Sequence, residues 1–183
     1  MPRIYLGLGS NLQPAKNLKL AVSELARRFS LVAVSAVYRN AAVGFVGDDF
    51  LNAVAAIETD LSPTAVCREL EAIHDLAGRI RGTDAFVSRT LDVDLLLYGD
   101  EILESPSVPR SDILQYSFVL RPLAEIAPDL VHPLSGKTMA RHWAEFDTDS
   151  HHLTRDSLVL STPAQESENR RQVTGTARPI GDN

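Results

Sequence analysis

Cysteine is scarce in this sequence and long hydrophobic runs are missing, and each absence narrows what the protein can be. Cys67 is the only cysteine among 183 residues, so no internal disulfide can form and we expect a cytoplasmic protein. No apolar segment approaches the roughly 20 residues that span a bilayer, and no apolar stretch after Arg3 forms a secretory signal. The net charge of −6 argues against a nucleic-acid coat. We therefore expect neither a membrane nor a nucleic acid as a partner.

The rest of the composition is that of an ordinary globular protein, with 44% hydrophobic and 23% charged residues. The length fits a single domain with a sizeable core. From about residue 160, the sequence is dominated by Ser, Thr, Gln, Glu, Arg and Gly and offers almost nothing to bury. We therefore predict one domain over residues 1–160 and a disordered tail over residues 161–183.

Hydrophobic periodicity predicts alternating strands and helices through most of the domain. Strands are predicted at 3–9, 31–38, 50–59 and in the run that ends at Gly99, and helices at 15–29, after the cap Ser62, at 117–127 and after the cap Thr138. Loops or irregular segments are predicted at 39–49, 79–90 and 100–116. The β-α-β-β-α-β order predicts an α+β, ferredoxin-like fold, in which helices pack on one face of an antiparallel sheet.

Two glycine-containing motifs resemble phosphate-binding loops but lack part of the pattern. The run from Gly7 to Leu12 has no third glycine, so we interpret it as a tight turn between a strand and a helix. The run from Ser135 to Thr138 has Val131 where the first glycine of a P-loop belongs, so we interpret it as a turn followed by a helix cap.

The most informative motif is a pair of aspartates in an otherwise aliphatic strand. Strand side chains alternate between faces, so Asp92 and Asp94 are predicted to point the same way. Two such carboxylates repel each other and are costly to desolvate, and a Mg²⁺ ion would relieve both costs. Solvation or pairing with arginine would also explain the pair. The nearby arginines Arg79, Arg81 and Arg89 favour the metal, because arginine and Mg²⁺ together hold phosphate.

Asn52 is a polar residue inside an apolar strand. A buried amide must be hydrogen-bonded, either to backbone or to a polar heterocycle, and the sequence leaves both alternatives open. Phe50 and Phe118, taken singly, fit core positions as well as a ligand platform.

Taken together, these segments resemble the hydroxymethyl-dihydropterin pyrophosphokinases, an enzyme family of folate synthesis. The resemblance covers about residues 3 to 146. It is carried, in family order, by Gly9-Ser10-Asn11, Tyr38-Arg39, Phe50-Leu51-Asn52-Ala53, Gly78-Arg79-Ile80-Arg81, Arg89-Thr90-Leu91-Asp92-Val93-Asp94-Leu95 and Phe118-Val119-Leu120-Arg121-Pro122-Leu123-Ala124-Glu125-Ile126-Ala127-Pro128. The last two runs are distinctive in combination.

The resemblance implies a ferredoxin-like fold and Mg²⁺-dependent transfer of pyrophosphate from ATP to 6-hydroxymethyl-7,8-dihydropterin, with release of AMP. By motif match, Asp92 and Asp94 would hold two Mg²⁺ ions, and Arg79 and Arg89 would be catalytic residues that clamp the phosphates. Asn52 would bind the amide edge of a pterin stacked between Phe50 and Phe118. The full substrate-binding set would be Asn40, Ala41, Val43, Phe50, Asn52 and Phe118, and the ATP-binding set Glu71, His74, Arg81, Phe86, Leu95, Arg110 and Ser111. We expect a monomer or a weak dimer.

The sequence departs from the family pattern mainly on the ATP side. Phe86 stands where the family usually has tryptophan, Arg110 where it often has histidine, and His74 where it often has an acidic residue. The alternative is therefore a diverged paralogue that binds a pterin or nucleotide with weak or no catalysis, or one that acts on a different pterin acceptor. The intact Arg89, Asp92 and Asp94 favour the enzyme.

Overall fold

The centre of the computed structural model is a six-stranded sheet in which every described pairing is antiparallel. The structure describes residues 1–43, 46–78 and 90–162. The strands are β1 (Arg3–Ser10), β2 (Ser30–Val34), β3 (Tyr38–Asn40), β4 (Phe50–Glu58), β5 (Asp92–Tyr98) and β8 (Thr154–Arg155), and β6 (Leu103–Glu104) and β7 (Ser107–Val108) form a separate hairpin. The sheet order is β5-β1-β4-β3-β8, with β2 also paired to β4. This order confirms the predicted ferredoxin-like α+β core.

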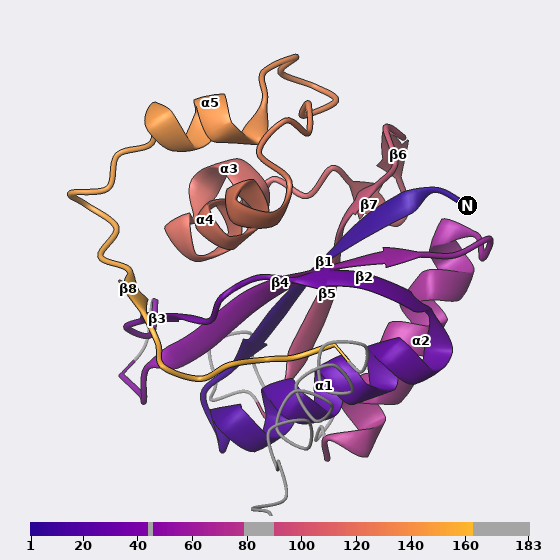
Figure 1. Cartoon of the computed structure of the whole chain (residues 1–183), viewed down its shortest axis with the longest axis horizontal. Coiled ribbons are helices and arrows are strands. Elements are labelled where there is room, and N and C mark those ends of the chain that lie inside the picture. The colour runs from indigo at the N-terminus through magenta and orange to yellow at the C-terminus, as the bar shows by residue number, and fades with distance from the viewer. Residues whose placement is uncertain (44–45, 79–89, 163–183) are drawn as a thin grey trace, which may run out of the picture.

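Helices cover both faces of the sheet, and not one face as predicted. The helices are α1 (Pro14–Arg28), α2 (Pro63–Leu76), α3 (Asp112–Gln115), α4 (Ser117–Ile126) and α5 (Met139–Ala144). Figure 1 shows α1 and α2 below the sheet and α3, α4 and α5 above it. The reason lies in β4, where Ala55 and Ile57 join the α1–α2 core while Val54 and Ala56 join the α3–α4 core. A strand that is apolar on both faces must be covered on both.

The predicted strand at 31–38 is divided into β2 and β3, both paired with β4. At the division, Ser35 exchanges hydrogen bonds with Val54: its backbone N–H donates to the Val54 carbonyl and its hydroxyl accepts the Val54 N–H, each at 2.9 Å. Glu125 on α4 accepts the Ala36 N–H at 3.0 Å and the Tyr38 hydroxyl at 2.7 Å. Polar side chains therefore satisfy the backbone where the strand bends.

The long helices and their caps follow the predictions closely. Ser62 caps α2 by accepting the Ala65 N–H at 3.3 Å, and Thr138 caps α5 by accepting the Arg141 N–H at 3.2 Å. Gly78 follows α2 with φ of +79°, a conformation that glycine adopts without strain. The segment 100–116, predicted to be irregular, contains the β6–β7 hairpin and α3. These short elements were missed because periodicity needs more residues than they have.

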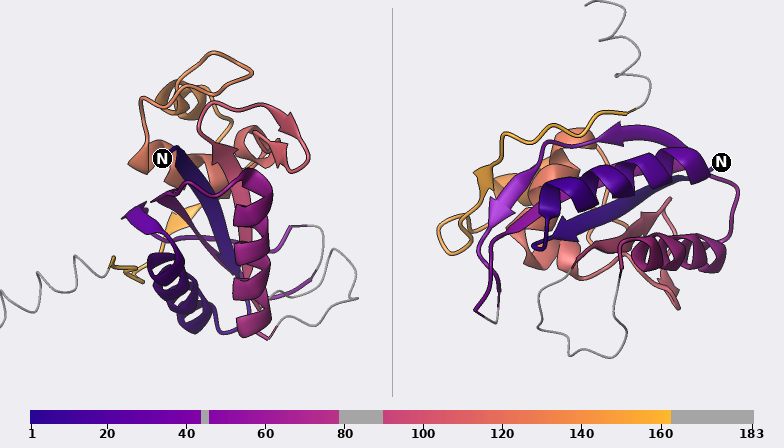
Figure 2. Two further views of the ribbon diagram at one scale, coloured as in Figure 1. Left: turned by 90° about the vertical axis from the view of Figure 1, so that its right-hand side faces the viewer. Right: turned by 90° about the horizontal axis from the view of Figure 1, so that it is seen from below.

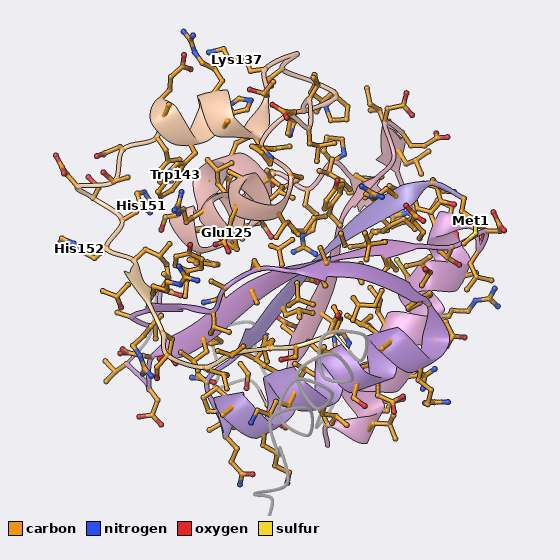
Figure 3. The ribbon with its side chains drawn as sticks, viewed as in Figure 1. Met1, Glu125, Lys137, Trp143, His151 and His152 are labelled. Carbon is orange, nitrogen blue, oxygen red and sulfur yellow. The ribbon has the colours of Figure 1, made fainter. Side chains whose placement is uncertain are left out.

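A C-terminal strap (residues 150–162) leaves α5 and returns along the opposite edge of the sheet from β5 (Figures 1 and 2). Figure 3 places His151 and His152 where the chain descends from α5. Leu158 and Leu160 then pack against the α1–α2 core, and Thr162 is buried. The predicted tail at 161–183 lies, beyond Thr162, outside the described residues. None of the helices in the described ranges is both long and apolar enough to cross a membrane.

Candidate active site

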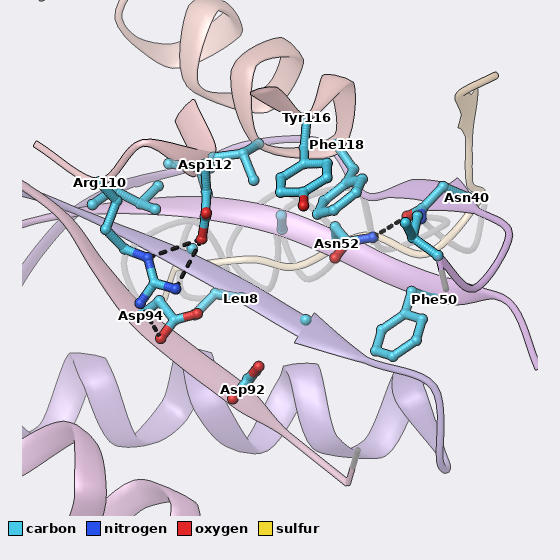
Figure 4. Close-up of a pocket in the computed structure, with 17 residues that line it drawn as sticks. Leu8, Asn40, Phe50, Asn52, Asp92, Asp94, Arg110, Asp112, Tyr116 and Phe118 are labelled. Carbon is cyan, nitrogen blue, oxygen red and sulfur yellow. Dashed lines mark hydrogen bonds and ion pairs between the residues drawn. The ribbon is translucent and has the colours of Figure 1, made fainter. Parts of the chain in front are cut away.

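A cavity of about 300 Å³ lies over the α3–α4 face of the sheet, where β1, β4 and β5 meet (Figure 4). Its floor follows the register of the strands. Gly9 on β1 lies opposite Asn52 on β4 and opposite Asp92 on β5, and Gly7 lies opposite Asp94. Because Gly7 and Gly9 have no side chains, β1 leaves open space between the Asn52 amide on β4 and the carboxylates of Asp92 and Asp94 on β5.

The glycines are part of a strand, and the interpretation of this segment as a tight turn was wrong. β1 continues to Ser10, and the turn into α1 begins after it. A Cβ added at Gly9 would lie only 3.1 Å from Oδ1 of Asn52. A side chain at position 9 would therefore displace Oδ1 of Asn52 by a few tenths of an ångström, and glycine leaves that oxygen in place.

The two aspartates share a face of β5, as the alternation predicted. Both are half-buried and both line the first cavity. Burial raises the pKa of Asp94, and the neighbouring Asp92 carboxylate raises it further, whereas Arg110 and His74 act in the opposite direction. Burial and a second carboxylate thus both disfavour the charged form of Asp94, and a hard divalent cation bound between the two carboxylates would favour it. Within the described ranges, no third histidine, cysteine or acidic residue completes a metal-binding group with them.

Arg110 bridges two carboxylates beside the cavity (Figure 4). Its Nη1 lies 2.9 Å from Oδ1 of Asp94, and its Nη2 lies 2.8 Å from Oδ2 of Asp112. Asp112 opens α3, and the sequence analysis did not identify it. Arg110 itself was predicted to bind ATP. In the structure, its guanidinium forms an ion pair with Asp94, which was predicted to bind the metal.

At the other end of the cavity, two buried asparagines form a fixed chain of amides. The Asn40 amide donates to the Ala41 carbonyl at 2.8 Å, and its Oδ1 accepts the Asn52 amide at 2.5 Å. These bonds orient both side chains, because the NH2 group of each asparagine donates to a defined acceptor. Oδ1 of Asn52 is left over the Gly9 floor of the cavity. The site therefore presents a buried hydrogen-bond acceptor to a ligand.

Aromatic rings flank Asn52. Phe50 and Phe118 line the cavity from different sides, and Tyr116 stacks on Phe118 with ring centroids 5.0 Å apart (Figure 4). Tyr116 was not predicted, because only its place in the fold brings it to the cavity. Val43 also lines the cavity, whereas Ala41 contributes its carbonyl to the amide chain instead.

A second cavity of about 420 Å³ adjoins the first and shares Asp92, Asp94 and Arg110 with it. The structure brings to this second cavity the predicted ATP-binding residues Glu71, His74, Leu95, Arg110 and Ser111. Arg79, Arg81, Phe86 and Arg89, which were predicted to bind or clamp ATP, lie outside the described residues. Segments distant in sequence thus converge on one edge of β5.

His74 is buried on α2 and holds β5 in place. Its Nε2 accepts the Val93 N–H at 2.8 Å, so this nitrogen carries no proton. Its Nδ1 lies 3.5 Å from Oε1 of Glu71. Val93 lies between the two aspartates, so His74 fixes the backbone that carries both carboxylates.

The start of β5 is held from the other side by residues that the sequence analysis did not assign. The Thr90 carbonyl accepts the Ser10 hydroxyl at 2.5 Å and the Asn17 amide at 2.8 Å. Ser10 and Asn17 are both buried. In the sequence, the one indication of this contact was the polar residue Asn17 directly beside the buried stripe of a helix.

Comparison with known proteins identifies relatives of this chain. The family model described as 7,8-dihydro-6-hydroxymethylpterin-pyrophosphokinase (HPPK) matches residues 5–128. A 2-amino-4-hydroxy-6-hydroxymethyldihydropteridine pyrophosphokinase from Haemophilus influenzae is 41% identical over 137 residues, covering 72% of this chain and 85% of the relative. The protein of that name from Methylorubrum extorquens is 40% identical over 153 residues, covering 80% and 95%.

Solved structures share the fold at much lower identity. An HPPK-DHPS structure in complex with substrates aligns with a TM-score of 0.64 at 10% identity, covering 79% of this chain and 43% of that one. Wild-type Plasmodium falciparum HPPK-DHPS aligns with a TM-score of 0.60 at 12% identity, covering 79% and 44%. The present chain therefore spans less than half the length of these structures, and the likeness establishes the fold.

Proposed function

The chain belongs to the 7,8-dihydro-6-hydroxymethylpterin-pyrophosphokinase family, and we propose that its two adjoining cavities bind the two substrates of the family's reaction. The protein is an ATP-dependent pyrophosphokinase of folate biosynthesis, which transfers pyrophosphate from ATP to hydroxymethyl-dihydropterin. The hydroxymethyl oxygen forms a bond to the β-phosphorus of ATP, the bond between that phosphorus and the oxygen on the α-phosphorus breaks, and AMP leaves. The proton of the hydroxyl group is released.

The strongest support for assigning the pterin to the first cavity and ATP to the second is the position of two side chains. Asn52 and Asp92 lie on either side of Gly9, so a ring bound at the amide would reach toward phosphates bound at the carboxylates. Such an arrangement brings the hydroxymethyl oxygen and the reacting phosphorus together. Positioning of this kind is a large part of the catalysis of phosphoryl-type transfer.

The first cavity would bind the pterin. Oδ1 of Asn52 would accept a hydrogen bond from an N–H group of the heterocycle, and the amide chain through Asn40 would hold that oxygen in place. The ring would stack between Phe50 and Phe118, with Val43 at its margin. Ala41 would act through its carbonyl, which accepts the Asn40 amide. A polar ring that satisfies a buried acceptor is bound selectively over an apolar one.

The donor set of Asp92 and Asp94 fits Mg²⁺, and two ions are proposed. Carboxylates are the ligands that Mg²⁺ prefers, and it commonly binds through one or two of them together with substrate phosphates. Bound there, Mg²⁺ would neutralise phosphate charge and align the polyphosphate. In the protein, the two carboxylates supply the anchoring charge, and His74 and Thr90 hold the strand that carries them.

The second cavity would bind ATP. Arg110 would move from Asp94 to the phosphates, and Glu71, His74, Leu95 and Ser111 would border the nucleotide. The proposed ATP-binding set also includes four residues that lie outside the described ones: Arg79, Arg81, Phe86 and Arg89. Of these, Arg79 and Arg89 would stabilise the charge that develops during transfer.

With Cys67 as its only cysteine, the chain suits the reducing cytoplasm. We propose a monomer or weak dimer, which light scattering over a range of protein concentrations would test.

The direct test of the proposed function is a coupled assay for AMP with purified protein, ATP and Mg²⁺, run with and without hydroxymethyl-dihydropterin. We expect AMP only when the pterin is present, in equal amount to pyrophosphorylated pterin. Binding of the pterin without AMP release would instead support the non-catalytic alternative. Turnover only with another pterin would indicate a different acceptor.

A further inference from the structure

The C-terminal strap pairs with the strand that supplies one wall of the first cavity. β3 has only three residues, and β8 covers the edge of it that β4 leaves open, with Arg39 opposite Thr154 and Tyr38 opposite Arg155. The strap lies beyond residue 128, where the match to the family model ends. A short edge strand gains its rigidity from its neighbours, so the strap contributes to fixing β3.

Asp156 is the main anchor of this pairing. Its backbone N–H donates to the Val37 carbonyl at 2.8 Å, and its Oδ2 lies 2.7 Å from Nη2 of Arg39. Its Oδ1 accepts the Leu158 N–H at 2.9 Å. The Asp156 side chain is 14% exposed and that of Arg39 is 45% exposed, so the carboxylate is partly desolvated while the guanidinium remains in contact with solvent.

The last residue of β3, Asn40, lines the first cavity. Arg39 is followed by Asn40, whose Oδ1 accepts the amide of Asn52. Arg39 also faces the segment that precedes Phe50, because its Nη1 lies 3.8 Å from Oδ2 of Asp49. The Arg39 guanidinium therefore contacts both the strap, through Asp156, and Asp49, the residue that directly precedes β4.

We infer that the C-terminal strap positions the pterin-binding wall, and that it acts through the Asp156–Arg39 pair on Asn40 and Asn52. The inference rests on the proposed pterin site. Asp156 contacts no substrate in this account; it is a positioning residue. Without the pair, β3 would sample positions in which Asn40 no longer orients Asn52, and apparent pterin affinity would fall by the fraction of misaligned protein.

The test compares the full-length wild type with Asp156→Asn, Arg39→Gln and the double variant. Asp149→Asn, at an exposed residue in the turn before the strap, is the charge-matched control. Binding of 6-hydroxymethylpterin is measured by calorimetry in the presence of α,β-methylene-ATP, and KM is determined for each substrate. Urea unfolding of every variant reports stability separately.

We expect about five-fold weaker pterin binding in Asp156→Asn and Arg39→Gln, no further loss in the double variant, and a KM for ATP within about two-fold of wild type. Unchanged pterin binding together with lower stability would overturn the inference, because it would show a purely structural role. A parallel rise of both KM values, or additive losses in the double variant, would also overturn it. Failure of the wild type to bind the pterin would instead refute the proposed function, and the inference with it.

Discussion

At the residue scale, the site depends on the absence of side chains as much as on their presence. The carboxylate pair could be predicted, because strand alternation alone places Asp92 and Asp94 on one face. The role of Gly9 could not, because it depends on the register of β1 against two other strands. The Arg110–Asp94 contact also escaped prediction, since it depends on how the segment before α3 packs beside β5.

Alanine at position 9 is expected to impair the pterin side selectively. Its Cβ would lie 3.1 Å from Oδ1 of Asn52 and would displace that oxygen by a few tenths of an ångström. We expect a several-fold rise in KM for the pterin in Gly9→Ala, because hydrogen bonds weaken with poor geometry. Gly7→Ala is the control, since its Cβ would meet only the Leu96 side chain at 3.4 Å. Equal effects of both changes on pterin KM would contradict the assignment of Asn52.

Replacing Arg110 is expected to have opposite effects on the metal and on the nucleotide. Its guanidinium lies 2.9 Å from Oδ1 of Asp94 and competes with a cation for that oxygen. In Arg110→Gln, Mn²⁺ used as a probe should bind more tightly without nucleotide, because like charges no longer repel. ATP should bind about ten-fold more weakly, since a charge-assisted contact to phosphate is lost. Paramagnetic resonance of free Mn²⁺ and ATP titration measure the two effects. Weaker Mn²⁺ binding in the variant would rule out this competition.

At the element scale, local signals predicted the regular parts of the fold, and tertiary contacts determined the rest. α2 begins at a cap and ends before a glycine, both visible in sequence. The division between β2 and β3 depends on Glu125, which reaches the backbone from α4. Pairing of β8 with β3 likewise joins segments more than 100 residues apart. No periodicity within either segment could have indicated these contacts.

The contact between α2 and β5 leads to a prediction about His74. Its Nε2 is the acceptor for the buried Val93 N–H, so His74→Phe leaves a donor without its partner. We expect a loss of about 1–3 kcal/mol in the free energy of unfolding, and lower kcat because the carboxylates on either side of Val93 shift. His74→Gln offers an amide oxygen in a similar place and should restore part of both. Urea denaturation and steady-state kinetics provide the measurements, and full stability in His74→Phe would contradict this role.

Docking of the strap should weaken in acid. Hydrogen bonding from the Leu158 N–H, and then from Arg39, lowers the pKa of Asp156 below its usual value. A carboxyl with a lowered pKa in the folded state stabilises that state fully above its unfolded pKa, and the stabilisation disappears as pH falls through the folded pKa. The stability gap between wild type and Asp156→Asn should therefore be full near neutral pH and close below about pH 4. Urea denaturation of both proteins at a series of pH values measures this difference in stability. A difference that persists in strong acid would contradict the ion pair.

At the scale of the whole molecule, two layers of helices around one sheet create two cavities that share an edge. The α1–α2 layer places His74 behind β5, and the α3–α4 layer places Phe118 over β4. Family resemblance led to a predicted set of ATP-binding residues, and the fold brings the described members of that set to a single cavity. The resemblance could not predict the role of the strap, because the strap lies beyond residue 146, where the resemblance ends, and beyond residue 128, where the match to the family model ends.

In the proposed mechanism, Asp92 and Asp94 anchor the metal and the phosphates, while Asn52 binds the pterin independently of them. The most direct measurement compares wild type with Asp94→Asn for AMP release and for pterin binding in the same preparation. We expect Asp94→Asn to lose at least about 100-fold in kcat and still to bind 6-hydroxymethylpterin with nearly wild-type affinity. Full turnover in a folded Asp94→Asn protein would rule out a metal-anchoring role for Asp94.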